Sequence, residues 1–206
     1  MAIDMQQSTL QMTWEADGEL VLNLTPLQGL WTEAQYLRLT DQTNRLIEFT
    51  DGVIEVLPMP TMYHQKILAY LYRSFFVLMQ ALGGIVLFAP LRMHIRPGTF
   101  REPDLLLLLD KHDPRAQDEF WLGADLVVEI VSPDRPKRDT EEKPVDYAEA
   151  GIPEYWIVNP LDQTITVLTL EGNAYTAHGI FRRGQTATSL LLQGFAVEVS
   201  AVFDAT

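Results

Sequence analysis

The sequence has no cysteine among its 206 residues, which excludes disulfide bonds, thiolate nucleophiles and cysteine-ligated zinc. It also has no apolar run of the roughly 20 residues that a membrane-spanning helix needs. The leucine run at residues 105–109 is only long enough for a strand. The N-terminal sequence MAIDMQQSTL lacks the basic and apolar segments of a secretory signal. We therefore expect a cytoplasmic protein that does not enter a membrane.

Positive charge is scarce, since 15 lysines and arginines stand against 28 aspartates and glutamates and the net charge is −13. This balance disfavours a protein that binds nucleic acid over a broad basic face. Neither a GKS/GKT phosphate loop nor a GxGxxG motif occurs, so nucleotide-driven chemistry is not supported. The hydrophobic content of 47% and the charged content of 21% are typical of a folded protein.

Several helices can be predicted from periodicity and capping residues. Residues 61–82 place their apolar side chains on one face and end at a pair of glycines, which predicts a long helix. Thr32 and Gln35 form a capping-box pattern at the start of a short helix. A third helix is expected from about residue 143 to 150, with proline tolerated in its first turn.

Strand patterns cover much of the remaining sequence. Residues 46–57 alternate on both sides of an Asp-Gly pair, which is typical of a β-hairpin. From residue 164 onwards, short alternating runs separated by glycine predict antiparallel hairpins. Further strand-like runs lie at residues 19–24, 85–89, 91–95, 105–109, 126–131 and 154–158. We expect one α+β (α/β-like) domain over residues 1–206, with a mixed β-sheet; residues 1–18 show no clear period.

Two carboxylates interrupt apolar strand segments. Asp104 begins the run at residues 105–109, and Glu129 lies in the middle of the run at residues 126–131. Alternation places Leu126, Val128 and Ile130 on one face of this second strand and Glu129 on the other. A buried carboxylate is costly unless it is paired, protonated or bound to a metal ion. The alternative is an edge-strand glutamate that pairs with an arginine.

Together with Lys143 on the following helix, these two carboxylates form a minimal set for metal-assisted phosphodiester hydrolysis. Asp104 and Glu129 would hold Mg²⁺ or Mn²⁺, which leaves coordination positions for water and phosphate oxygens. Lys143 would orient the attacking water or neutralise developing negative charge. Glycoside hydrolases also use two carboxylates, but aromatic sugar platforms are not evident near these residues.

The motifs that carry these residues occur in a characteristic order. They are Pro103-Asp104, the EIVSP run from Glu129, Lys143 with Tyr147, and the EYW run from Glu154. In this order the chain resembles PD-(D/E)XK nucleases, and more narrowly the Uma-two putative restriction endonuclease family, from about residue 31 to 170. The hairpin that carries Glu48 and the helix that begins near His64 are further features of that family.

This resemblance implies a restriction-endonuclease-like core, in which helices flank a mixed β-sheet, and a Mg²⁺-dependent endodeoxyribonuclease with DNA as its partner. It also implies that Glu48, Asp104 and Glu129 surround the metal ion. Lys143 would complete the catalytic set, with support from Glu48, His64 and Tyr147. A histidine at a helix start is, however, more often a cap or a surface group than a ligand, and Tyr147 could simply pack.

One position departs from the superfamily pattern. The lysine expected two positions after the glutamate is Val131 here, so Lys143 is the candidate replacement. Pro144 follows it and predicts a non-helical backbone for Lys143. The missing lysine and the net negative charge favour an alternative function, a nuclease fold kept as a binding or assembly module. A homodimer is expected if the protein cuts both strands of a duplex, because two sites are then needed.

Overall fold

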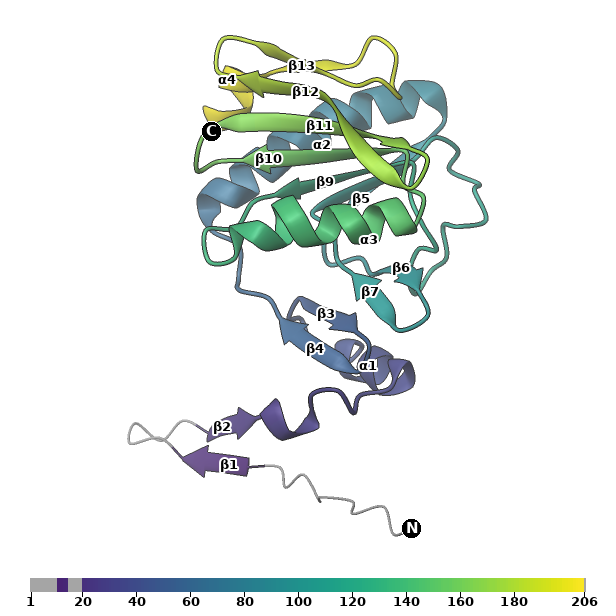
Figure 1. The fold of residues 1–206 in the computed structure, drawn as a ribbon. Helices are drawn as coiled ribbons and strands as arrows, with labels where there is room; N and C mark the ends of the chain where they lie inside the picture. Colours follow the sequence, from purple (N-terminus) through teal and green to yellow (C-terminus); the bar gives the residue numbers. More distant parts are fainter. Residues whose placement is uncertain (1–10, 15–19, 206) are drawn as a thin grey trace.

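The computed structural model describes residues 11–14 and 20–205 (Figure 1). Strands β1 (Gln11–Trp14) and β2 (Leu20–Asn23) pair antiparallel. The rest of the segment that lacks a clear sequence period lies outside the described residues. The short 3₁₀ helix η1 (Thr25–Leu27) then leads into α1 (Glu33–Thr40), where the predicted capping box between Thr32 and Gln35 is present. The described elements give the α+β content that the sequence predicts.

A six-stranded mixed sheet forms the main body, in the order β12-β11-β10-β9-β8-β5. Only β9 and β10 pair in parallel, and the other neighbours are antiparallel. The strands are β5 (Ile85–Phe88), β8 (Leu105–Leu108), β9 (Leu126–Ile130), β10 (Glu154–Asn159), β11 (Thr164–Glu171) and β12 (Ala174–Arg182). Because β9 lies in the interior of this sheet, the alternative interpretation of Glu129 as an edge-strand residue is wrong.

Helices cover both faces of the six-stranded sheet, with α2 (Met62–Leu82) behind it and α3 (Lys143–Glu149) in front in Figure 1. The apolar face of α2 packs in one core cluster with Leu126, Val128 and Ile130, while Val127 belongs to the cluster on the other face. The predicted two faces of this strand are thereby confirmed. Helix α2 ends at a left-handed glycine at position 83, as its sequence predicts.

A four-stranded antiparallel sheet, in the order β4-β3-β7-β6, lies below the main sheet in Figure 1. It contains β3 (Ile47–Thr50), β4 (Val53–Val56), β6 (Met93–Arg96) and β7 (Thr99–Arg101). The predicted hairpin around the Asp-Gly pair is formed by β3 and β4. The chain passes from β7 to β8 through residues 102–104, so the two sheets meet at the segment that contains Asp104.

A π-helical turn, η2 (Arg138–Glu142), leads directly into α3. Lys143 has φ −60° and ψ −34°, so its backbone is helical and the non-helical conformation predicted from Pro144 is wrong. The backbone N–H of Lys143 donates to the carbonyl of Arg138 and holds this residue in the helical turn. The proline lies in the first turn of α3, where its missing N–H is tolerated.

The C-terminal region follows the predicted hairpins for most of its length. β11 pairs with β12, and β13 (Thr186–Thr188) pairs with β14 (Ala196–Glu198), both antiparallel. A short helix, α4 (Val199–Phe203), ends the described chain where the sequence predicted only strands. Among the described residues, no helix has the length and hydropathy needed to cross a membrane.

Candidate active site

The two predicted carboxylates lie side by side where β8 begins and β9 ends. Leu105 of β8 pairs with Val128 of β9 in an antiparallel register, so the next position on each strand brings Asp104 beside Glu129. Glu129 points to the face covered by α3, away from the apolar residues that contact α2. The sequence thus placed both carboxylates correctly, one at a strand start and one within a strand.

Asp104 is held by one backbone and one side-chain partner. Its Oδ2 accepts a hydrogen bond of 2.7 Å from the backbone N–H of Ile130, and His64 Nε2 lies 3.2 Å from each of its carboxylate oxygens. Burial opposes protonation of His64, but the hydrogen bond and charge of Asp104 outweigh it and raise the pKa of the imidazole. The other ring nitrogen of His64 is buried and has no hydrogen-bond partner in the described chain.

Glu129 is 3% exposed and carries two contacts on one oxygen. Its Oε1 accepts a 2.5 Å hydrogen bond from the Tyr147 hydroxyl and lies 2.7 Å from Lys143 Nζ. Burial raises the pKa of Glu129 to about 8; Lys143 opposes this, whereas the nearby carboxylates, led by Asp104, add to it. Burial and the neighbouring carboxylates together therefore outweigh Lys143 and favour the protonated form of Glu129.

Lys143 lies at the centre of three carboxylates. Besides Glu129, its Nζ lies 3.2 Å from Glu48 Oε1 and 3.3 Å from Asp139 Oδ1. Burial acts to lower the pKa of Lys143, but the carboxylates outweigh it and raise the pKa, so the ammonium stays charged. For Glu48, burial acts to raise the pKa, and Lys143 and Arg101 together lower it. Lys143 and Tyr147 share one helical face, as their spacing predicts, and both contact Glu129.

Sequence reasoning missed several charged residues of this site. Asp139 is 2% exposed, and its Oδ2 accepts a long 3.4 Å hydrogen bond from the backbone of Ser132. Arg138 Nε lies 3.5 Å from Asp139 Oδ1, and Arg101 Nη1 lies 3.8 Å from Glu48 Oε2. The sequence carried no signal for Asp139, because the π-helical turn that brings it beside Lys143 precedes the helix expected from about residue 143.

Glu102 is another buried carboxyl that the sequence did not single out. It is buried, its Oε2 has no hydrogen-bond partner in the described chain, and burial raises its pKa to about 8. The Glu48 charge adds to this rise. Its backbone N–H donates to Glu48 Oε1 at 3.4 Å. Glu102 therefore links the segment before β8 to the hairpin that carries Glu48.

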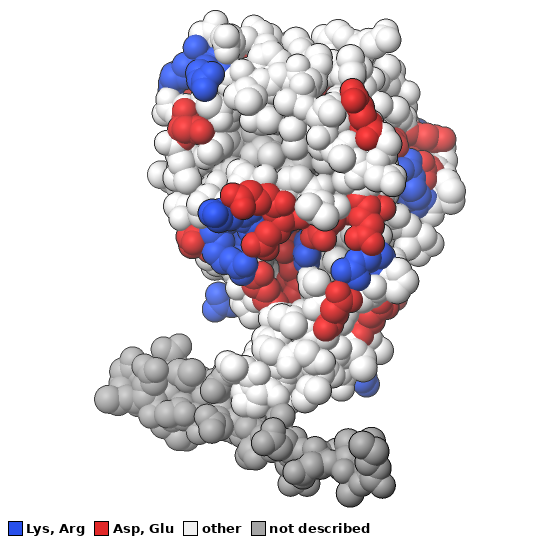
Figure 2. All heavy atoms as spheres, viewed as in Figure 1, with Lys and Arg blue, Asp and Glu red and all other residues white. Residues whose placement is uncertain are grey.

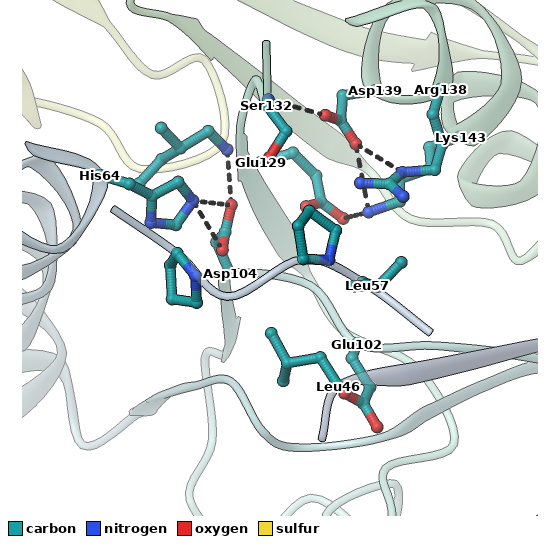
Figure 3. Close-up of a pocket in the computed structure, with 13 residues that line it drawn as sticks. Leu46, Leu57, His64, Glu102, Asp104, Glu129, Ser132, Arg138, Asp139 and Lys143 are labelled. Carbon is teal, nitrogen blue, oxygen red and sulfur yellow. Dashed lines mark hydrogen bonds and ion pairs between the residues drawn. The ribbon is translucent and has the colours of Figure 1, made fainter. Parts of the chain in front are cut away.

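These side chains surround a small cavity of about 30 Å³. In Figure 3, His64 and Asp104 lie on one side, Arg138, Asp139 and Lys143 on the other, and Glu129 between them. This volume is enough for about one or two water molecules or a metal ion. On the face shown in Figure 2, acidic and basic side chains gather side by side around the middle of the molecule. The site is thus a small cavity lined by both acidic and basic side chains.

A divalent metal ion fits the donor chemistry of one side of this cavity. Among the described residues, no group of three or more histidine, aspartate or glutamate side chains is arranged to hold a metal ion. Glu48 and Glu129 share Lys143, whereas Asp104 pairs with His64. Mg²⁺, however, is commonly bound by one or two carboxylates, with water and phosphate oxygens completing its shell. Asp104 and Glu129 supply such a pair. That Glu48 joins these two residues around a single metal ion stays a prediction.

Comparison with solved structures first defines the class of fold. The chain superimposes with a TM-score of 0.68 on the crystal structure of a protein from Anabaena variabilis described as a putative nuclease, at 17% sequence identity. The match covers 81% of this chain and 96% of the other. The fold is therefore that of this nuclease-like protein, as the sequence predicts. None of the curated proteins compared matches the chain.

Comparison with protein families then gives the particular family. Residues 33–200 match the Uma2 family, described as "Putative restriction endonuclease". The chain belongs to this family, which confirms the resemblance inferred from its motifs. The described family activity is that of a nuclease, with nucleic acid as the substrate.

Proposed function

We propose that the protein is a metal-dependent endonuclease that hydrolyses phosphodiester bonds in DNA with Mg²⁺ or Mn²⁺. The observation that supports this most is the meeting of Asp104, Glu129 and Lys143 at one buried cavity, from three separate segments of the chain. Family membership supports the reaction class.

The side chains of the site have separable roles in this proposal. Asp104 and Glu129 hold the divalent ion, which when bound polarises the phosphate and lowers the pKa of a water molecule. The Ile130 N–H and His64 orient Asp104. Lys143 and Tyr147 both bind Oε1 of Glu129, and in the described chain Oε2 accepts no hydrogen bond. One carboxylate oxygen is thereby fixed while the other stays available.

Substrate would reach the cavity past His64. This residue also lines a neighbouring groove of about 340 Å³, together with Pro58, Tyr63, Ser132 and Pro133. The groove is large enough for part of a nucleotide, whereas the cavity itself is not. Cutting both strands of a duplex needs two such sites, so a homodimer belongs to this proposal.

The alternative function, a nuclease fold that serves as a binding or assembly module, is favoured by one specific feature. The Lys143 ammonium already neutralises part of the carboxylate cluster, and no three-ligand metal group exists among the described residues. In this case the chain would cut no nucleic acid under any divalent metal ion.

A nicking assay on supercoiled plasmid with Mg²⁺ or Mn²⁺ distinguishes the two functions. In the double variant Asp104→Asn/Glu129→Gln, we expect nicking to fall by at least ~100-fold, because both metal-binding carboxylates are lost. The matched control is Asp118→Asn/Glu171→Gln, which makes the same charge change at two exposed positions and should cut like the wild type. Cleavage of a single-stranded RNA, measured with the same metal ions, tests the preference for DNA.

Unchanged nicking by the Asp104/Glu129 double variant would overturn the proposed site. No cutting by the wild type with either metal ion, on plasmid or RNA, would favour the binding module.

A further inference from the structure

A mostly apolar groove opens beside the candidate active-site cavity. It has a volume of about 340 Å³ and shares Pro58, Pro60, His64 and Ser132 with that cavity. The groove and the cavity are therefore neighbours along a common wall. The volume of the groove lies within the range of about 300–1,000 Å³ that is typical of small-molecule sites. A substrate group whose phosphate reaches the cavity can thus extend into the groove.

The chemistry of the groove is poorly suited to a phosphate. Its described lining residues include no lysine or arginine, and the carboxylate among them is that of Asp134. Four of the lining residues are prolines, which carry no backbone N–H, so the walls offer few hydrogen-bond donors. A second cleft, which borders Lys143, is by contrast lined by charged side chains such as Glu55 and Arg138. The groove therefore suits a flat, uncharged group that is attached to a phosphate, and not the phosphate itself.

Tyr63 gives the groove an aromatic wall. This residue is 39% exposed, and its hydroxyl donates a 3.1 Å hydrogen bond to the backbone carbonyl of Phe203. The bond holds the ring in place and leaves part of its surface accessible. Nucleobases stack on aromatic side chains of this kind with little sequence preference. The hydroxyl of Ser132 has no hydrogen-bond partner in the described chain, so it is available to the polar edge of a base.

We propose that the groove binds the nucleobase next to the scissile phosphate, with the base against Tyr63 and the phosphate at Asp104 and Glu129. This inference rests on the proposed nuclease function and specifies its substrate, which is DNA in which that base is unpaired. A base inside a duplex must leave the stack to enter the groove, and this costs least at a mismatched or single-stranded position. The chain therefore cuts unpaired DNA in preference to a fully paired duplex. Supercoiled plasmid remains a substrate, because negative supercoiling favours local strand opening.

Two comparisons of charge-matched DNA test this inference. Fluorescence anisotropy measures binding to the Asp104→Asn/Glu129→Gln variant, which prevents cutting. A duplex with one T·T mismatch should bind at least ~10-fold more tightly than the same duplex fully paired. A thymidine strand should bind about 10-fold more tightly than a strand of equal length in which every nucleotide is abasic, because the abasic strand has no base to place in the groove.

Two substitutions in the same background locate the effect on the protein. Tyr63→Ala should weaken binding of the thymidine strand about 10-fold and leave binding of the abasic strand unchanged. Phe76→Ala is the matched control, because it removes an aromatic side chain of similar exposure, 42%, from the same helix. It lies about 20 Å further along α2 and does not line the groove. Binding of both strands should be unchanged in this control.

Equal affinity for the thymidine and abasic strands would overturn the inference, as would equal losses in Tyr63→Ala and Phe76→Ala. The comparison of strands leaves the groove unaltered, so it decides the question even where circular dichroism shows that Tyr63→Ala is unfolded. Base-dependent binding together with no cutting by the wild type would support the groove and overturn the proposed nuclease function. Cutting of the paired and mismatched duplexes at equal rates would support the nuclease and overturn the groove.

Discussion

Tyr147 and Lys143 bind the same oxygen of Glu129, which makes the tyrosine hydroxyl the simplest test of how this carboxylate is positioned. In Tyr147→Phe we expect a stability loss of about 1–2 kcal/mol, because a buried hydrogen bond to the Glu129 carboxyl group is lost. Nicking should fall on the order of 10-fold, since partners of metal-binding carboxylates typically matter by that amount. Urea unfolding and the plasmid assay measure the two effects.

Tyr175→Phe provides the matched control for this change. The Tyr175 hydroxyl donates a 2.7 Å hydrogen bond to the Ile152 carbonyl, away from the cavity. Its loss should lower stability by a similar amount and leave nicking unchanged. Equal nicking by the two variants would show that Tyr147 only packs.

Some residues of the site could be predicted from the sequence, and others could not. Asp104 and Glu129 could be predicted because a carboxylate in an apolar strand is anomalous whatever surrounds it. Arg101 and Asp139 could not, because a charged residue in a polar segment is ordinary until its partner is known. Arg101 and Glu48 are 53 positions apart in the sequence, and only the packing of β7 beside β3 brings them together.

At the scale of elements, a single buried glutamate fastens the C-terminal segment to the main sheet. Glu154 at the start of β10 accepts four hydrogen bonds: Trp156 Nε1 at 2.7 Å and Ser189 Oγ at 2.6 Å on one oxygen, and the N–H groups of Leu190 and Leu191 at 2.8 and 2.9 Å on the other. These donors satisfy a carboxylate that is fully buried. The segment after β13 is thereby tied to β10.

Glu154→Gln replaces one carboxylate oxygen with an NH₂ group. This group would face two hydrogen-bond donors, because each oxygen of Glu154 accepts from two. We expect a loss of about 3 kcal/mol in the free energy of unfolding, because hydrogen bonds to a charged acceptor are lost and buried donors are left unpaired. The amide protons of Leu190 and Leu191 should exchange faster with solvent, as measured by hydrogen-exchange NMR.

The control is Glu171→Gln at the exposed end of β11, which should change stability by less than about 0.5 kcal/mol. If the Leu190 and Leu191 amides of Glu154→Gln exchange as slowly as in the wild type, Glu154 does not hold this segment against β10.

Elements with strong local signals could be predicted, and those that depend on packing could not. Helix α2 has a cap at Thr61, an apolar face and a terminal glycine, so its limits were evident. Helix α4 and the turn η2 have five residues each, too few to be stable alone. Burial of Val199 and Phe203 in the core stabilises α4. The backbone of Lys143 likewise follows the turn before it and its three ion pairs, which override the local preference set by Pro144.

At the scale of the whole molecule, most basic side chains near the cavity already have acidic partners. Arg135 and Arg138 both bind Glu55, and Arg101 binds Asp146 at 2.6 Å. With a net charge of −13, the protein offers few free cations to a phosphate backbone. We therefore expect nucleic acid to be bound mainly by the cavity and its metal ion, and less by a broad positively charged surface.

This charge distribution predicts a weak salt dependence of DNA binding. Each neutralised phosphate contributes about −0.9 to the slope of log K against log salt concentration. We expect a slope no steeper than about −3, measured by fluorescence anisotropy on a labelled duplex in Mg²⁺, with the Asp104→Asn/Glu129→Gln variant used to prevent cutting. Arg135→Gln should leave the slope nearly unchanged, because Glu55 already pairs with this arginine. A slope near −6 or steeper would mean that a broad cationic surface binds the backbone, which the paired arginines of this structure do not provide.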